Sequence, residues 1–223
     1  MCYSNMRSTL LVACLLTGIS LAQQPPKTMT KIEVILGSPD TPAGSFAAKP
    51  KVYYRAGTRY CRIEEAADPD RGVHNLMIVN EPDYWTVNLM TKTARHDVDR
   101  GPTFSCHLPI FAYGTPQSLD HETKEIRELE FGLELEFFKS RGATAEKGPV
   151  LQTKQTTVYR AKVGTAALAL FTYGTPERPL GVGIQQGDRS DLFWYSGYGT
   201  VEFDARLFAK PENVKIEEAQ ASH

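Results

Sequence analysis

The sequence predicts an α+β protein in which a curved antiparallel β-sheet, an incomplete barrel, wraps around a central helix. Short runs of β-branched and aromatic residues are separated by turn residues about every 8–12 positions, which is typical of an antiparallel meander. One segment between these runs, residues 118–142, repeats its apolar residues at helical spacing. With 223 residues, 41% of them hydrophobic, the chain can also bury a real core.

The charge balance excludes one class of function. The chain has 25 Lys and Arg against 26 Asp and Glu, a formal net charge of −1. A dedicated nucleic-acid binder would carry a basic excess or stripe. We therefore expect no nucleic acid among its partners.

The first 22 residues have the pattern of an export signal. Arg7 supplies the positive region, residues 10–22 form an apolar run too short to span a bilayer, and Ser20 and Ala22 are the small residues that signal peptidase requires. We expect cleavage after Ala22 and a periplasmic or secreted protein.

Lipidation is a second interpretation of the same N-terminal segment. Leu11 to Cys14 resembles a lipobox, so lipidation at Cys14 is a minor alternative to cleavage after Ala22.

The predicted organisation is a signal peptide at 1–22, a strand with a Pro/Gly-rich loop at 23–50, one curved-sheet domain at 51–216 and a tail at 217–223.

After cleavage two cysteines remain, Cys61 and Cys106. In an oxidising compartment they form most simply one disulfide, worth about 3–4 kcal/mol in the chain-entropy model. Buried thiols, or a metal site with His74, His96 and His107, are the alternatives, although no pair has the short spacing of a recognisable metal motif.

The expected strands lie on both sides of the predicted helix. They are residues 31–36, 52–55, 58–64, 75–79, 84–89, 93–98, 152–162, 167–173, 180–186 and 192–203, with a final edge segment within 207–216.

The helix over residues 118–142 competes with a strand. Its apolar residues at spacings of three and four are Ile126, Leu129, Leu133 and Phe137. Residues 129–137 also alternate at period two, but Leu and Glu favour helix and Gly142 marks an end. On this helix we expect Glu130, Glu134 and Glu136 on polar, solvated faces.

No nucleophile elbow, P-loop or dinucleotide-binding glycine motif occurs, so no catalytic residue, cofactor or metal is predicted. An enzyme remains as an alternative, a secreted metal-dependent hydrolase using His74, His96, Asp97 and His107. Arg55, Arg59 and Arg62 cluster around one hairpin, either as ordinary surface arginines or as a patch for anionic head groups.

Aromatic residues on the strands suggest a ligand cavity, because the concave side of a curved sheet can hold a hollow lined by apolar side chains. The same residues would serve equally well as plain core. The candidate ligand-binding residues from this pattern are Met77, Trp85, Leu89, Phe104, Leu133, Phe137 and Trp194.

One hexapeptide recurs 60 positions later. Residues 111–116 read FAYGTP and residues 171–176 read FTYGTP. The two copies are either equivalent loops of a duplicated unit or, as we favour, turns that reuse the same Gly, Thr and Pro chemistry.

Four segments carry a resemblance to a known family: KVYYRAGTRYCRIE at 51–64, NEPDYWTVNL at 80–89, TKTA at 91–94 and FDARLFAKPENVKI at 203–216. In strand style the chain resembles the LolA/LolB-like superfamily of bacterial periplasmic lipoprotein carriers over about two thirds of its length. The resemblance implies an incomplete barrel closed by helical segments, whose cavity binds acyl chains without catalysis or cofactor. It also implies ligand-binding roles for Arg62, on an early strand, and for Trp85, on the next hairpin.

The chain departs from that family in lacking an amphipathic helix before the first strands and in carrying the 118–142 segment and the cysteine pair. The predicted function is non-enzymatic binding of a hydrophobic or amphiphilic ligand, lipid or lipoprotein-like, in the half-barrel. The expected partners are a hydrophobic ligand or an acylated protein, with peripheral membrane contact. Besides the hydrolase, an envelope interaction module that pairs through its edge strands is the other alternative.

Overall fold

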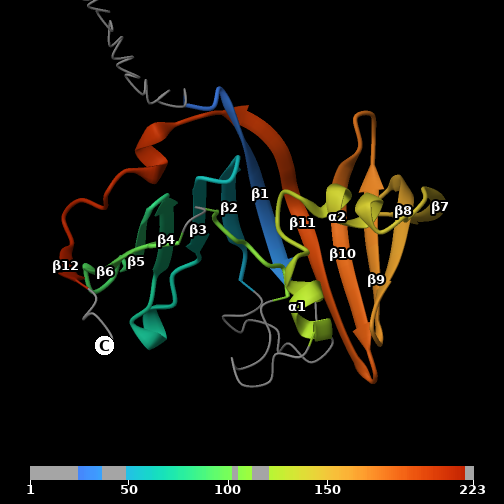
Figure 1. Cartoon of the computed structure of the whole chain (residues 1–223), viewed down its shortest axis with the longest axis horizontal. Coiled ribbons are helices and arrows are strands. Elements are labelled where there is room, and N and C mark those ends of the chain that lie inside the picture. Colours follow the sequence, from blue (N-terminus) through green and yellow to red (C-terminus); the bar gives the residue numbers. More distant parts are fainter. Residues whose placement is uncertain (1–24, 37–48, 102–104, 112–120, 219–223) are drawn as a thin grey trace, which may run out of the picture.

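One sheet of twelve strands carries the fold in the computed structural model, which describes residues 25–36, 49–101, 105–111 and 121–218. The strand order is β12-β6-β5-β4-β3-β2-β1-β11-β10-β9-β8-β7, and the sheet stays open at both ends (Figure 1). The strands are β1 (Thr28–Leu36), β2 (Lys51–Ala56), β3 (Tyr60–Glu65), β4 (Asn75–Asn80), β5 (Asp83–Asn88), β6 (Thr93–Val98), β7 (Glu146–Leu151), β8 (Lys154–Val163), β9 (Ala166–Tyr173), β10 (Arg178–Gln186), β11 (Arg189–Glu202) and β12 (Lys215–Glu218).

Two antiparallel meanders, β2–β6 and β7–β11, are joined through β1, which pairs with β2 on one side and β11 on the other. The register between β1 and β11 shifts at Glu33/Val34, where β11 has one extra residue. The register shift is therefore a bulge inside a 14-residue strand. A bulge increases local twist and bends the strand, which favours a curved sheet.

Side chains alternate between two faces of the sheet. The inner face carries the main core, which includes Ile32, Val34 and Tyr53, together with the helices α1 (His121–Arg127) and α2 (Glu134–Ser140). The outer face carries two smaller clusters, one around Trp85 and one around Phe208. Thus the predicted fold class is confirmed: one open, curved antiparallel sheet with helical segments in its concavity.

The predicted continuous helix over 118–142 is two short helices. Between them Leu129 accepts a backbone hydrogen bond from Ile110, and Phe131 donates one to Leu108, each at 2.9 Å. Gly132 then has φ +87°, a conformation that ends helical geometry, and a Cβ there would lie 3.2 Å from Cδ of Arg55. The period-two pattern of residues 129–137 therefore corresponds in part to a short extended segment. The chain is helical only on either side of that segment.

Most strands follow the sequence prediction, with shifts at their ends. The exception is β7, whose sequence EKGPVL contains Gly and Pro and carries no β-strand pattern. The C-terminal edge segment divides into a 3-10 turn, η4 (Ala205–Phe208), and β12, which pairs parallel to β6 after the chain has passed to the far end of the sheet (Figure 1). A second 3-10 turn, η2 (Pro69–Arg71), joins β3 to β4.

Several expectations fall outside the described residues. These are the signal peptide, Cys14, Phe104, residues 112–116 of the first hexapeptide copy and most of the C-terminal tail. Within the part of the chain that the structure describes, none of the helices has the length and apolarity to cross a membrane.

Candidate functional site

The inner face is closed over the β1 and β8–β11 side of the sheet. Here Leu129, Phe131 and Phe138 are at most 2% exposed and belong to the main core, which also contains Leu170 of β9 and Val182 of β10. Phe131 stacks on Tyr53 with ring centroids 4.1 Å apart. The interior is thus solid where the helical segments cover it.

The inner face is hollowed over β4, β5 and β6 instead. A pocket of about 300 Å³ opens there between these strands and residues 105–107. Its lining residues are Met77, Val79, Glu81, Tyr84, Asp97, Val98, Asp99, Ser105, Cys106 and His107. The pocket therefore combines apolar side chains with several ionisable ones.

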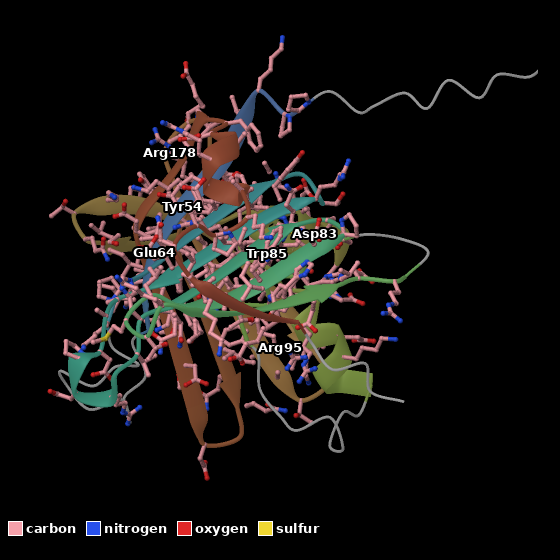
Figure 2. All side chains as sticks on the ribbon, turned by 90° about the vertical axis from the view of Figure 1, so that its left-hand side faces the viewer. Tyr54, Glu64, Asp83, Trp85, Arg95 and Arg178 are labelled. Carbon is pink, nitrogen blue, oxygen red and sulfur yellow. A yellow bond between two sulfur atoms is a disulfide. The ribbon has the colours of Figure 1, made fainter. Side chains whose placement is uncertain are left out.

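The pleat of the sheet brings the floor of the pocket together. Val79 of β4 is the direct cross-strand partner of Tyr84 on β5, which in turn pairs with Asp97 on β6. Met77 lies two residues before Val79 and so points to the same face. Figure 2 views this end of the sheet and labels residues of the opposite, outer face, among them Trp85 and Tyr54. Alternation along three neighbouring strands thus produces an apolar floor with an acidic edge.

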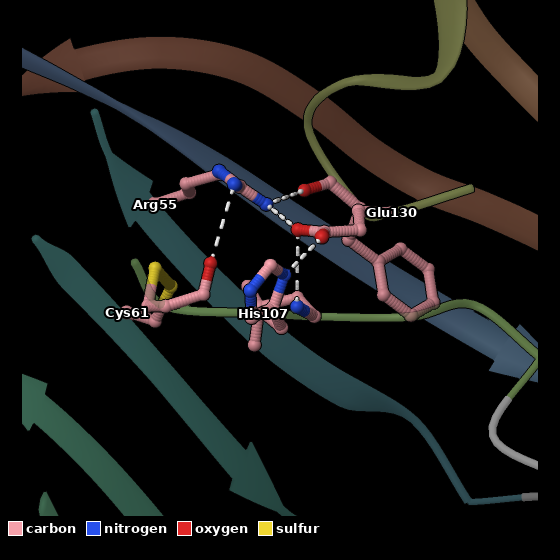
Figure 3. The surroundings of a disulfide bond; sticks show 7 residues. Arg55, Cys61, His107 and Glu130 are labelled. Carbon is pink, nitrogen blue, oxygen red and sulfur yellow. Dashed lines mark hydrogen bonds and ion pairs between the residues drawn. A yellow bond between two sulfur atoms is a disulfide. The ribbon is translucent and has the colours of Figure 1, made fainter. Parts of the chain in front are cut away.

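The wall opposite the floor is fixed by a disulfide. Cys61 of β3 and Cys106 are bonded, with their Cα atoms 6.1 Å apart, so the predicted pairing is present (Figure 3). The amide of Cys106 also donates a 2.7 Å hydrogen bond to the carbonyl of Thr58 in the β2–β3 turn. The wall is therefore anchored to the sheet by covalent and backbone bonds.

A buried ionic cluster holds the wall from behind (Figure 3). The guanidinium of Arg55 donates to the carboxylate of Glu130, which also lies 2.6 Å from Nδ1 of His107 and accepts from the amide of Leu108 at 3.2 Å. Burial acts to raise the pKa of Glu130, but the hydrogen bonds from Arg55 and His107 outweigh it and the pKa is lowered. Glu130 thus stays ionised and ties β2 to the segment that carries Cys106.

Glu81 contributes a second buried carboxyl, at the edge of the pocket. It lies in the turn between β4 and β5, where its amide donates to the carbonyl of Arg59 and its carbonyl accepts from the Arg59 guanidinium. The residue is 5% exposed, and its Oε2 accepts no hydrogen bond from the described residues. Burial raises the pKa of Glu81, and the Asp99 carboxylate raises it further.

A third buried carboxyl, Glu134, belongs to the core and not to the pocket. It accepts from the hydroxyls of Tyr195 at 2.8 Å and Tyr198 at 3.1 Å, and from the amide of Gly132 at 3.1 Å. Burial raises the pKa of Glu134, and burial beside this carboxyl also raises the pKa of both tyrosines. The network fastens the start of α2 to β11.

Two of these three carboxyls correct the sequence-based expectations. Glu130 and Glu134 were expected on solvated helix faces, yet they are 6% and 1% exposed. Arg55, expected as one of three surface arginines, is equally buried because it pairs with Glu130. The partners lie 75 residues apart in sequence, so no local pattern indicates the pair.

The predicted ligand-binding residues divide between the two faces. Met77 lines the pocket, Phe137 lies in the main core and Leu133 occupies the N-cap position of α2. Trp85 and Leu89 belong to an outer-face cluster that Val214 and Ile216 cover.

The other two described candidates also lie on the outer face. Arg62 donates to the carbonyl of Leu207 in η4 and to Glu64. Trp194 of β11 packs near Phe171 of β9, with ring centroids 6.5 Å apart. The structure therefore brings one predicted residue, Met77, to the pocket and places Arg62, Trp85 and Trp194 away from it.

Of the residues named for the hydrolase alternative, Asp97 and His107 line the pocket, while His74 and His96 lie outside its lining. His74 lies 3.7 Å from Glu64, His96 lies 2.8 Å from Asp83, and His107 contacts Glu130. Across residues 25–36, 49–101, 105–111 and 121–218, no three His, Cys, Asp or Glu side chains form a group suited to a metal ion.

Comparisons with known proteins give likenesses in structure only. No family model matches the chain, and no curated protein matches it. Among solved structures, an uncharacterised conserved protein from Thermus thermophilus matches at TM-score 0.46 and 13% identity, covering 86% of this chain and 91% of that one.

Two further solved structures match the chain at lower TM-scores. A LolA superfamily protein from Nitrosomonas europaea matches at TM-score 0.30 and 9% identity, covering 84% of this chain and 91% of that one. A domain assigned to outer membrane lipoprotein sorting, from Vibrio parahaemolyticus, matches at TM-score 0.29 and 11% identity, covering 78% of this chain and 85% of that one. At these TM-scores the structural likenesses carry no argument about function. The functional argument rests on the pocket alone.

Proposed function

We propose that this chain is a non-enzymatic protein that binds a hydrophobic or amphiphilic ligand in the inner-face pocket over β4–β6. The observation that carries the proposal is the composition of the pocket. Its floor is apolar, with Met77, Val79 and Tyr84, and its edge is ionisable. A molecule with an apolar chain and a polar end matches both parts.

The volume limits the ligand. Small-molecule sites span about 300–1,000 Å³, and this pocket lies at the lower end. It would take a short chain, or the end of a longer acyl chain such as that of an acylated protein. Each methylene moved from water contributes about 0.8 kcal/mol, so even a short chain gains useful affinity. The flexible thioether of Met77 can adjust to chains of different shape.

The sequence indicates the cellular compartment in which this binding would occur. The export signal directs the chain to the periplasm or the exterior, and the Cys61–Cys106 disulfide suits an oxidising compartment. Lipids and acylated proteins are ligand sources in such a compartment, where this protein would make peripheral contact with a membrane.

Filling the pocket tests the proposal. The protein is purified without detergent, and binding of short amphiphiles with eight-carbon chains is followed by native mass spectrometry and thermal shift. We expect Met77→Trp to remove most of the ligand-dependent thermal shift, because the indole occupies the floor. Val150→Trp is the matched control, since Val150 lies on the edge strand β7, far along the strand order, and is 64% exposed.

Two results would contradict this function. One is the absence of both co-purifying ligand and thermal shift with any of the amphiphiles. The other is an equal loss of binding in Met77→Trp and Val150→Trp, which would place the ligand outside the pocket.

A further inference from the structure

One residue that lines the pocket, Glu81, has a carboxylate oxygen without a hydrogen-bond partner among the described residues. Glu81 is only 5% exposed. Its Oε2 is buried and accepts no hydrogen bond from any residue in the described part of the chain. A buried acceptor in this condition costs free energy of a size comparable to a lost hydrogen bond. Such an exception within a pocket indicates a partner supplied from outside.

The other charged groups of the pocket are already engaged with protein partners. Asp97 forms an ion pair with Arg95, with Oδ2 and Nε 2.9 Å apart. Asp99 accepts a 2.7 Å hydrogen bond from the amide of Gly101. His107 is held by Glu130. Among the pocket carboxyls of the described residues, Glu81 is therefore the one that combines burial with an oxygen lacking a hydrogen bond.

The neighbouring Arg59 does not neutralise this carboxyl through a hydrogen bond. The Arg59 guanidinium donates to the backbone carbonyl of Glu81. Its charge and that of His107 act to lower the pKa of Glu81, but burial and Asp99 outweigh them and raise it. Three carboxyls line the pocket, from Glu81, Asp97 and Asp99, against one imidazole, so the pocket favours positive charge.

We propose that the pocket selects amphiphiles with a cationic, N–H-donating head group, such as a primary alkylammonium, and that Glu81 is the residue that receives it. This inference rests on the proposed function and names its ligand class. The ammonium donates to the carboxylate of Glu81, and the alkyl chain lies against Val79, Met77 and Tyr84. A charge-assisted hydrogen bond of this kind is stronger than one between neutral groups. An anionic head group would instead be desolvated beside three carboxyls.

Matched probes test this selectivity on the unmodified protein. Octylamine, octanol and octanoate share a chain length and differ in head-group charge, and their affinities at pH 7 are measured by calorimetry below their aggregation limits. We expect octylamine to bind about tenfold or more tightly than octanol, and octanoate to bind most weakly. Equal or tighter binding of octanoate or octanol overturns the inference while leaving the proposed function in place. Binding of none of the three overturns both.

A variant assigns the selectivity to its residue. Glu81→Gln keeps the shape of the side chain and removes its charge, so we expect octylamine to lose about tenfold in affinity while octanol changes little. Glu128→Gln is the control, because Glu128 is exposed and pairs with Arg141 outside the pocket. Unchanged octylamine binding in Glu81→Gln would refute the role of Glu81. If that variant does not fold, the comparison of probes on the unmodified protein decides.

Discussion

At the scale of single residues, the buried pair of Arg55 and Glu130 governs how the wall of the pocket is held. Both side chains are less than a tenth exposed. Arg55 also donates to the carbonyls of Phe131 and Cys106, so one guanidinium joins β2 to both segments that face the pocket and the core. A buried pair adds little when compared with an apolar replacement of both partners, but removal of one partner leaves a buried charge.

We therefore predict that Arg55→Met destabilises the protein by about 3 kcal/mol at pH 7, the lower end of the range for a broken buried pair. The loss is at the lower end because His107 and the amide of Leu108 still donate to Glu130. Chemical denaturation measures it. The control is Arg160→Met, which removes an exposed pair with Glu146 and should cost less than about 1 kcal/mol.

The same variant should change the pH dependence of stability. In the native protein the pKa of Glu130 is below its usual value, so its contribution is present above the pKa of the unfolded chain, about 4.3, and is lost as the pH falls through the lowered pKa. In Arg55→Met, burial is opposed by fewer donors and the carboxyl protonates more readily. The stability difference between the two proteins should therefore shrink from pH 7 toward pH 4, and a constant difference would contradict the assignment.

At the scale of elements, a glycine decides how β9, β10 and β11 fit on the outer face. Gly181 of β10 pairs with Phe171 on β9 and with Trp194 on β11. A Cβ at Gly181 would lie 2.7 Å from Cε3 of Trp194, closer than real Cβ atoms approach a neighbour. The missing side chain makes room for the indole between the strands.

Gly181→Ala is accordingly expected to destabilise the protein by about 1–3 kcal/mol, as overpacking does, because the indole must move. Thermal unfolding measures the effect. Gly199→Ala is the matched control in β11, where a Cβ would meet nothing within 4 Å, and it should stay within about 0.5 kcal/mol of the parent. Similar losses in both variants would show that strand propensity rather than the Trp194 contact is responsible.

Elements also differ in how well the sequence predicts them. The strands β2–β6 were predicted almost to their ends because hairpin turns and alternation are local signals. The 118–142 segment was not, because its break depends on backbone bonds from Leu129 and Phe131 to a segment about twenty residues earlier. Helical spacing on both sides of Gly132 hides such a break.

At the scale of the whole molecule, the site was less predictable than the fold. An apolar lining that included Met77 followed from strand composition, but the faces of Trp85 and Trp194 depend on register, and a shift of one residue reverses them. Glu81 carried no signal, since its burial arises only where the β4–β5 turn meets Arg59 and the end of β6. Curvature decides which part of the concave face is filled, and composition does not encode it.

After β11 the chain returns across the part of the sheet formed by β1–β6 and covers its outer face. From β11 it passes through η4 to β12, which pairs with β6 at the opposite end of the meander (Figure 1). Val214 and Ile216 of this return segment pack on the cluster that contains Trp85, which is 5% exposed. The cluster around Trp85 is thus sealed by residues that lie far from it in sequence.

Removing residues 210–223 should therefore expose Trp85. We expect its fluorescence emission to shift to longer wavelength and the melting temperature to fall by about 4–8 °C, which corresponds to about 2 kcal/mol from two half-buried apolar side chains. Trp194, the other tryptophan, is replaced by Phe in every sample so that one emission is read. A chain ending at Glu218 keeps β12 and serves as the control. If both chains emit alike, the return segment does not cover Trp85, and the outer face must be closed by another part of the molecule.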